Sequence, residues 1–307
     1  MLRNEIHATE GLEVRMNHPL ATLITQFLKE RTYLQNVSER TLVWYRVAFK
    51  NYQAVIPADA AVLPTKATLQ QFVVALRERG IRPVTCNTYV GAMNAFCAWL
   101  HQEGHARERV KLQKLRVERR LLTLLDDAQM RAMIGYKPKT FRQARVHLAA
   151  PLILDTGLRI SEALHVRDSD ADCDNLILKV LGKGQKERLV PFSPELRRRL
   201  YRYQQLRAKQ GIRSEFLFAG FEGTRWEKRN STTSLYLLQD KLGLPRFGWH
   251  RLRHTFATNY LRHGGDIVRL SMVLGHTQIT TTQRYLHLVP NDLSATHDRV
   301  SILGRLG

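Results

Sequence analysis

The second half of this 307-residue chain carries, in order, a set of residues whose types suit phosphodiester chemistry without a metal: Arg159, Lys183, His250, Arg253, His276 and Tyr285. Attack on a DNA phosphate builds negative charge on two non-bridging oxygens. Arginine meets such oxygens with a planar, always charged fork. A tyrosine hydroxyl supplies a nucleophile that conserves the bond energy as a phosphotyrosine. The set therefore predicts an enzyme that cuts and rejoins DNA strands.

Arg159 and Glu162 lie three residues apart, so a helix would place them on one face. An isolated pair of this kind is usually a surface ion pair of little energetic value. Here the preceding Thr156-Gly157-Leu158 is a tight turn, which presents Arg159 at the start of a helix. From there Arg159 can reach a phosphate while Glu162 supports the local geometry.

Lys183 lies between two glycines of a predicted hairpin turn. Such turns are usually only turns, and a lysine there is usually solvated. A lysine at a hairpin tip can also reach a scissile bond and protonate the leaving oxygen. A phosphate-binding P-loop is excluded, because Gly184 stands where that motif needs Ser or Thr.

Two patterns resemble metal sites. His250 and His254 are four residues apart and invite zinc, but Arg251 replaces the glutamate of a zinc protease and no third ligand is near in sequence. The acids at positions 168, 170, 172 and 174 resemble the start of a calcium loop. Cys173 replaces the glycine that such a loop requires, so we expect a turn between strands. We expect no metal and no other cofactor.

The last two members of the set have common structural alternatives. His276 follows Leu274-Gly275, and a histidine in that position often caps the end of a helix. A single tyrosine such as Tyr285 is most often part of a hydrophobic core. Each residue alone is a weak signal, and the order and spacing of the whole set carry the prediction.

The composition fits a protein that binds nucleic acid. The net charge of +21 and a pI near 10.4 imply a polyanionic partner. A membrane surface is the alternative, but no stripe of Lys and Arg opposes a clean apolar face. No apolar run approaches the roughly 18 residues of a membrane span, and the N-terminus lacks the apolar segment of a secretion signal. The three cysteines lie far apart, as expected of reduced thiols in the cytoplasm, where the protein would be associated with the nucleoid.

The first part of the chain is predicted to be a small helical domain. We expect residues 1–16 to be a flexible tail and residues 17–104 to form four helices with apolar residues at helical spacing. Ser38 is the expected N-cap of the second helix. Residues 105–122 form a basic linker. Its only acidic residues are Glu108 and Glu118, whereas its basic residues are Arg107, Arg109, Lys111, Lys114, Arg116, Arg119 and Arg120. A solvated helix face is the ordinary explanation, but in so positive a chain we favour a connector lying along phosphates.

Residues 123–307 are predicted to form a second, mainly helical domain with a small β-sheet. Two strand-like runs, 176–181 and 187–192, flank the turn that contains Lys183. Helical patterns cover these segments: about 140–165, 194–209, 230–242, 250–263, 266–275 and a short helix containing Tyr285.

This combination resembles the tyrosine recombinases, also called the phage integrase family, which includes the Xer recombinases. The resemblance rests on the segments 156–164, 182–191, 250–258 and 274–276, followed nine residues later by Tyr285. It covers about residues 18–300, including a helical core-binding DNA domain near the N-terminus. It implies a two-domain clamp around one DNA half-site.

The resemblance also implies the roles of the site residues. Tyr285 attacks the scissile phosphate and leaves a 3′-phosphotyrosine. Arg159, Arg253 and His276 stabilise the transition state. Lys183 protonates the leaving 5′-oxygen and His250 assists proton transfer at the nucleophile. Further DNA contacts are expected from these residues: Arg40, Thr41, Arg46, Asn87, Arg116 and Arg119.

The partners implied are double-stranded DNA with inverted-repeat half-sites and three further copies of the chain. Four protomers on paired sites would exchange strands in integration, excision, resolution or transposition. The C-terminal segment of each protomer would join it to a neighbour, and accessory proteins are possible further partners. Two alternatives stay open: a type IB topoisomerase, which cuts and religates as a monomer, and a basic DNA-binding regulator without chemistry.

Overall fold

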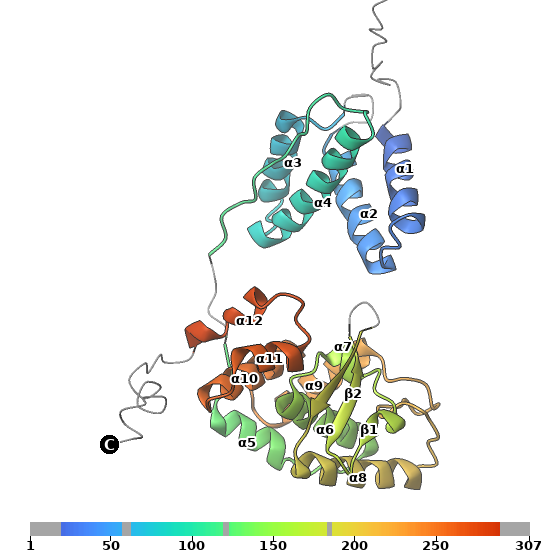
Figure 1. Cartoon of the computed structure of the whole chain (residues 1–307), viewed down its shortest axis with the longest axis vertical. Coiled ribbons are helices and arrows are strands. Elements are labelled where there is room, and N and C mark those ends of the chain that lie inside the picture. The colour runs from blue at the N-terminus through green and yellow to red at the C-terminus, as the bar shows by residue number, and fades with distance from the viewer. Residues whose placement is uncertain (1–19, 57–62, 119–122, 183–185, 289–307) are drawn as a thin grey trace, which may run out of the picture. The chain divides into compact units, whose positions relative to one another are not determined.

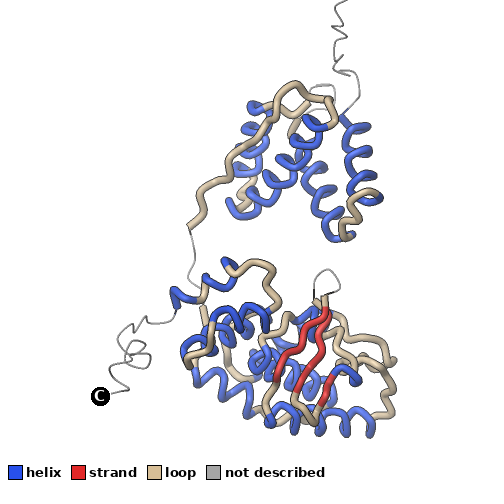
Figure 2. The backbone as a smooth tube through the Cα atoms, in the orientation of Figure 1, coloured by secondary structure: helices blue, strands red, loops and turns tan. Residues whose placement is uncertain are grey.

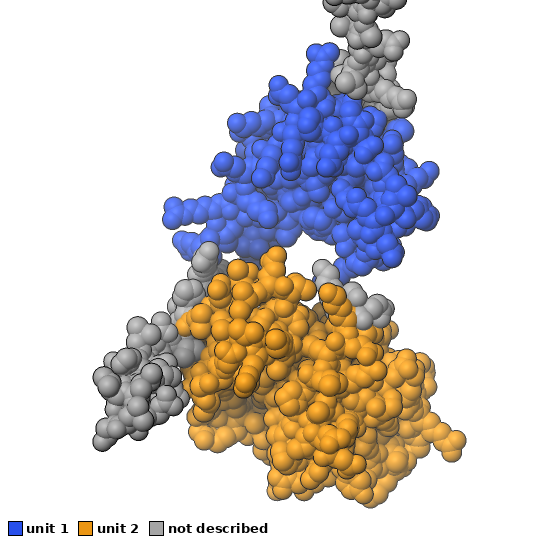
Figure 3. All heavy atoms as spheres, viewed as in Figure 1, with its two compact units in different colours: residues 1–120 blue, residues 121–307 orange. Residues whose placement is uncertain are grey.

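The computed structural model describes residues 20–56, 63–118, 123–182 and 186–288. The chain divides into two compact units, residues 1–120 and 121–307, which are coloured separately in Figure 3. Helices dominate both units, and one small sheet belongs to the second (Figures 1 and 2). The predicted mainly helical fold with a small sheet is therefore confirmed. Within the described residues, no helix is long and apolar enough to span a membrane.

The first unit consists of helices that share an aromatic core: α1 (Leu20–Tyr33), α2 (Glu39–Gln53), α3 (Lys66–Glu78) and α4 (Pro83–Gln102). The predicted cap of α2 is confirmed, because the Ser38 side chain accepts a hydrogen bond from the Thr41 backbone amide. Phe27 on α1 is fully buried, with Tyr45 from α2 and Phe96 from α4 edge-on at 4.9 and 5.4 Å. Such contacts add about 1 kcal/mol each beyond area burial.

Residues 105–118, here called the connector, form no helix or strand and are held against α4 by two asparagines. Asn94 Oδ1 accepts from the Leu112 amide and Asn94 Nδ2 donates to the Leu112 carbonyl, both at 2.9 Å. Asn87 makes the same pair of bonds to Leu115, at 2.7 and 2.8 Å. The DNA contact predicted for Asn87 stays a prediction, and in this structure its side-chain amide is hydrogen-bonded to the connector.

The second unit is built around α6. Its helices are α5 (Asp127–Gly135), α6 (Phe141–Thr156), α7 (Ile160–Ala163), α8 (Pro194–Lys209), α9 (Lys228–Lys241), α10 (Trp249–Arg262), α11 (Ile267–Leu274) and α12 (Thr280–Gln283). α6 is apolar on nearly every side and contacts α5, α8, α9 and α10, so it is the central helix of this unit. Short 3₁₀ turns follow at Asp168–Asp170 and Leu286–Leu288.

The sheet of the second unit is antiparallel, in the order β1 (Ala171–Asp172), β2 (Ile177–Leu181), β3 (Glu187–Pro191). Leu178 opposes Val190 and both are fully buried, which fixes the register by a single apolar face. Strands β2 and β3 were predicted, whereas β1 was not. The acidic run predicted to be a turn instead contains a 3₁₀ turn, β1 and then a turn in which Asp172 accepts hydrogen bonds from Asn175.

Candidate active site

The turn after α6 sets the geometry of the candidate site. Gly157 ends α6 with φ +67°, in the left-handed region that favours glycine. A Cβ at this position would lie 2.4 Å from Phe256 Cδ1 on α10 and 2.8 Å from Leu274 Cδ2 on α11. α6, α10 and α11 therefore meet at a point where no side chain fits.

Arg159 lies at the N-cap of α7, as the tight turn predicts. Its backbone amide donates to Glu162 Oε2 and its Nη1 donates to Glu162 Oε1, both at 2.8 Å. The side chain of Glu162 is 7% exposed, whereas that of Arg159 is 33% exposed. The buried carboxylate thus holds the arginine in place and leaves part of the guanidinium accessible to solvent.

Arg253 on α10 is buried and held by backbone carbonyls. Nη1 donates to the Gly157 carbonyl at 2.8 Å, and Nη2 donates to the Leu274 carbonyl at 2.9 Å. Nη2 also lies 2.9 Å from His276 Nε2. Burial and the charge of Arg159 lower the pKa of Arg253 to about 10, so the guanidinium stays charged at neutral pH.

The contacts of His276 define its tautomer. Arginine only donates, so Nε2 accepts from Arg253, and Nδ1 carries the proton that it donates to Thr282 Oγ1 at 2.8 Å. Burial and the neighbouring charge of Arg253 lower the pKa of His276 to about 4. His276 is therefore a neutral imidazole fixed between α10 and α12.

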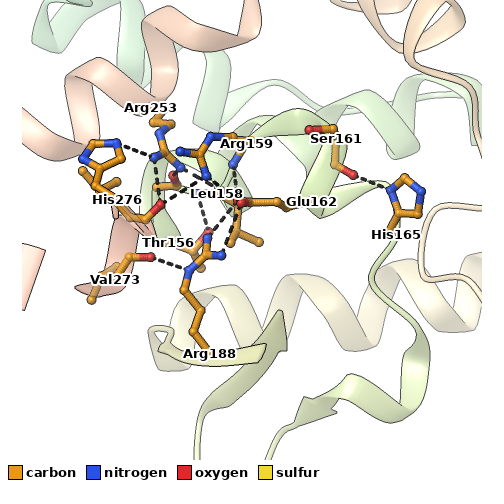
Figure 4. Close-up of polar contacts among 12 residues, drawn as sticks. Thr156, Leu158, Arg159, Ser161, Glu162, His165, Arg188, Arg253, Val273 and His276 are labelled. Carbon is orange, nitrogen blue, oxygen red and sulfur yellow. Dashed lines mark hydrogen bonds and ion pairs between the residues drawn. The ribbon is translucent and has the colours of Figure 1, made fainter. Parts of the chain in front are cut away.

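Arg188 on β3 is a member of the site that the sequence did not assign. Its Nη2 and Nη1 donate to Glu162 Oε2 and Oε1 at 2.8 and 3.2 Å, and its Nε donates to the Val273 carbonyl at 2.8 Å (Figure 4). The alternation of side chains along a strand could have identified Arg188, because residues 188 and 190 share a strand face and Val190 points into the core. An arginine on an inward strand face requires an acidic partner.

Glu162 and the three guanidiniums of Arg159, Arg188 and Arg253 form what we call the Glu162 cluster. Figure 4 shows the three arginine side chains converging on the carboxylate. Arg253 Nη1 is 3.8 Å from Glu162 Oε2. Burial alone would raise the pKa of Glu162, but hydrogen bonds and charge from Arg188, with hydrogen bonds from Arg159, hold it below its ordinary value. One negative charge against three positive charges leaves the cluster ready for an anion.

Tyr285 lies just after α12, not inside a short helix as predicted. It is 2% exposed, and its ring packs with Ala257, Leu270 and Leu274. Its hydroxyl is 2.9 Å from His254 Nδ1 on α10. Burial raises the pKa of Tyr285, while the positive charges of Arg253, Arg284 and Arg159 oppose that rise.

His250 lies one turn before His254 on α10 and is exposed. The centroids of the two rings are 6.4 Å apart. Partial desolvation of the ring, followed by the charges of Lys228 and Arg253, lowers the pKa of His250. The sequence expected His250 to assist at the nucleophile, but the hydrogen-bond contact with Tyr285 belongs to His254. Among the described residues, no group of three or more His, Cys, Asp or Glu side chains is placed to hold a metal ion.

The remaining predicted residues lie elsewhere or outside the described part. Lys183 and Arg119 lie outside the described residues. Arg40, Arg46 and Arg116 are exposed, and Arg46 Nη1 pairs with Glu39 at 2.5 Å. The Thr41 hydroxyl lies 2.9 Å from Ser38 Oγ within the cap of α2. DNA contacts from these residues remain predictions.

Comparison with known proteins shows the family to which this chain is related. The phage integrase family matches residues 123–292, which contain the whole Glu162 cluster and Tyr285. The tyrosine recombinase XerA of Thermococcus onnurineus is 30% identical over 237 residues, covering 76% of this chain and 81% of that protein. The tyrosine recombinase XerC of Corynebacterium glutamicum is 28% identical over 274 residues, covering 88% of each.

Solved structures share the fold at low identity. The Tn1549 transposon integrase in complex with transposon right end DNA has a TM-score of 0.75 at 19% identity, covering 91% of this chain and 99% of that one. The XerH site-specific recombinase bound to palindromic difH substrate has a TM-score of 0.70 at 18% identity, covering 90% and 84%. These relatives do not favour the topoisomerase or regulator alternatives. The chain belongs to the phage integrase family and is a site-specific DNA recombinase of the tyrosine type.

Proposed function

We propose that Tyr285 attacks a scissile phosphate seated on the Glu162 cluster and forms a 3′-phosphotyrosine with a free 5′-hydroxyl. Arg159 and Arg253 stabilise the charge that develops on the phosphate oxygens, and His276 acts with them through its contact with Arg253 Nη2. Lys183 protonates the leaving 5′-oxygen, and His250 assists proton transfer on the nucleophile side. The observation that carries the proposal is the excess of two positive charges in the cluster.

The cluster suits a phosphodiester because its charge is fixed before the substrate arrives. Arg253 is immobilised by two carbonyls and Arg188 by a carboxylate and a carbonyl. All hydrogen bonds of the Arg159 side chain within the described residues come from Nη1. Its Nε and Nη2 can therefore meet a phosphate oxygen without breaking the contact to Glu162. Preorganised donors of this kind need no rearrangement as charge develops in the transition state.

We further propose that the protein works as a homotetramer on two DNA sites, each with inverted half-sites bound by the two units. Beyond Tyr285 the sequence carries more apolar residues than a solvated tail needs: Leu288, Val289, Leu293, Val300, Ile302 and Leu303. α11 also exposes Val268 and Met272 in the same unit. Apolar surface of this kind supports exchange of the C-terminal segment between protomers.

We also propose that the protein acts on nucleoid DNA in the cytoplasm. The free cysteines of the protein, of which Cys86 and Cys97 are buried, agree with a reducing compartment.

The proposal is tested by selecting a DNA site with the protein itself. Nicked duplexes with randomised arms are incubated with the chain, and DNA that becomes covalently attached is recovered and sequenced. Adducts should converge on one inverted-repeat sequence, called the selected site below. Tyr285→Phe should bind that site with near-normal affinity and form no adduct, because only the attacking oxygen is removed.

Tyr201→Phe is the matched control, since Tyr201 on α8 is 63% exposed and remote in sequence from the cluster. It should form adducts at the rate of the unmodified protein. An adduct in Tyr285→Phe would mean that another residue is the nucleophile. Adducts spread over unrelated sequences would contradict site-specific recombination.

A further inference from the structure

His254 contacts Tyr285, but the proposed function gives His254 no role. His254 follows Arg253 directly on α10, so one residue belongs to the Glu162 cluster and the next contacts the proposed nucleophile. His254 Nδ1 is 2.9 Å from Tyr285 Oη, and the ring centroids are 5.6 Å apart at 50°. This is hydrogen-bond distance to the atom that must lose a proton when it attacks.

The direction of this hydrogen bond depends on the protonation of the two groups and on the tautomer of His254. Burial and then the charges of Arg284, His250 and Arg253 lower the pKa of His254 to about 4, so the imidazole is neutral at pH 7. The pKa of Tyr285 is raised, so the phenol keeps its proton. In the tautomer that carries its proton on Nε2, Nδ1 is unprotonated, so the phenol donates and the imidazole accepts. In that tautomer the proton of the nucleophile points at a base.

We propose that His254 is a further catalytic residue, the base that takes the phenol proton of Tyr285 during attack. In this step the Oη–H bond breaks and its proton goes to Nδ1, while Oη forms a bond to phosphorus. The bond from phosphorus to the 5′-oxygen breaks, and that oxygen takes a proton from Lys183. The imidazolium returns its proton to the tyrosine oxygen when the strand is rejoined. The inference rests on the proposed function and deepens it.

The surrounding charges link this proton transfer to the arrival of substrate. Arg253 contributes to the low basicity of His254 and is also a phosphate-binding residue in the proposed function. A bound phosphate offsets part of that positive charge and makes the imidazolium easier to form. Without a phosphate, the raised pKa of the phenol and the lowered pKa of the imidazole keep the proton on Tyr285. Tyr285 is then activated only where a phosphate is present to be attacked.

His254→Gln separates proton transfer from packing, because glutamine accepts a hydrogen bond through its carbonyl oxygen but does not bind a proton at neutral pH. On the selected site, single-turnover adduct formation should slow by about 100-fold, with DNA affinity unchanged. His263→Gln is the matched control: His263 caps the same helix, where Nδ1 contacts the Asn259 carbonyl, and is exposed. The control should keep the unmodified rate.

A more acidic nucleophile provides the second readout, which a purely structural role of His254 would not move. Difluorotyrosine at position 285 loses its proton more readily than tyrosine. It should speed adduct formation by about tenfold in His254→Gln and by less than about threefold with His254 intact. A full-rate His254→Gln protein, or an equal effect of fluorination in both backgrounds, would overturn the inference alone. Failure of the unmodified protein to form any adduct would overturn the proposed function, and this inference with it.

Discussion

Arg188 and Glu162 are joined by two side-by-side hydrogen bonds, Nη2 to Oε2 at 2.8 Å and Nη1 to Oε1 at 3.2 Å, between side chains that are 13% and 7% exposed. The pair connects β3, the strand that follows the lysine turn, to α7, whose N-cap residue Arg159 is proposed to bind phosphate. Arg188 also donates to the Val273 carbonyl at the end of α11. One side chain thus joins three elements around the proposed phosphate site.

Arg188→Lys should disturb this positioning while keeping the charge. Lysine cannot make the bidentate contact, so Glu162 and Arg159 lose their fixed geometry. Adduct formation on the selected site should fall by about 100-fold, the effect of a misplacement of about 1 Å. Arg167→Lys is the control, because Arg167 pairs with Glu215 at 3.5 Å with both side chains 56% exposed. If both variants cleave at the unmodified rate, Arg188 has no positioning role.

Glu162→Gln should remove a defined part of the pH dependence of stability. The folded-state pKa of Glu162 lies below its ordinary value of 4.5. Its stabilisation is therefore fully present above about that pH and is lost as pH falls through the lower folded pKa. Urea unfolding at a series of pH values should show the unmodified protein more stable at neutral pH and the two proteins converging in acid. A difference that grows on acidification would contradict the lowered pKa.

Gly157→Ala should be far more damaging than alanine at another left-handed glycine. Gly157 and Gly243 have φ of +67° and +65°, but a Cβ at 157 meets Phe256 at 2.4 Å whereas a Cβ at 243 meets nothing within 4 Å. Gly243→Ala should cost about 1 kcal/mol of unfolding free energy from backbone strain alone. Gly157→Ala should cost at least about 3 kcal/mol, because overpacking is added to the strain. Equal losses in urea unfolding would mean that the packing around Gly157 adjusts freely.

The double variant Asn87→Ala with Asn94→Ala should release the connector from α4. Each asparagine makes two hydrogen bonds to the connector backbone, so their loss lets the backbone around Lys111, Lys114 and Arg116 leave α4 and enter the active site of trypsin. Limited proteolysis should cut this segment at least about tenfold faster than in the unmodified protein, since local opening then costs less free energy. Asn51→Ala, which removes only a bond to Val47 on the same helix, should leave the cleavage rate unchanged.

The sequence predicted contacts that act over short distances along the chain. The Arg159–Glu162 pair, the Ser38 cap and strands β2 and β3 follow from spacing and capping rules. The partners that it missed are distant in sequence. Arg188 meets Glu162 across 26 residues and His254 meets Tyr285 across 31. Such contacts depend on how helices pack, which periodicity alone does not define.

The burial of Tyr285 was likewise not predictable from its neighbours in sequence. Its position is set by α10 and α11, which supply Ala257, Leu261, Leu270 and Leu274 around the ring. The same packing turns its hydroxyl toward His254 and not toward His250. Both histidines had been noted at helical spacing, but only the tertiary arrangement distinguishes them.

The most direct test of the account identifies the covalent bond itself. The adduct formed on the selected site in excess EDTA is digested with protease and nuclease, and the nucleotide-bearing peptide is sequenced by mass spectrometry. The account predicts one modified residue, Tyr285, joined to a 3′-phosphate, with a free 5′-hydroxyl on the other strand end and an undiminished yield in EDTA. Attachment through another residue, a 5′-phosphate linkage, or cleavage that stops with EDTA and returns with magnesium would contradict it.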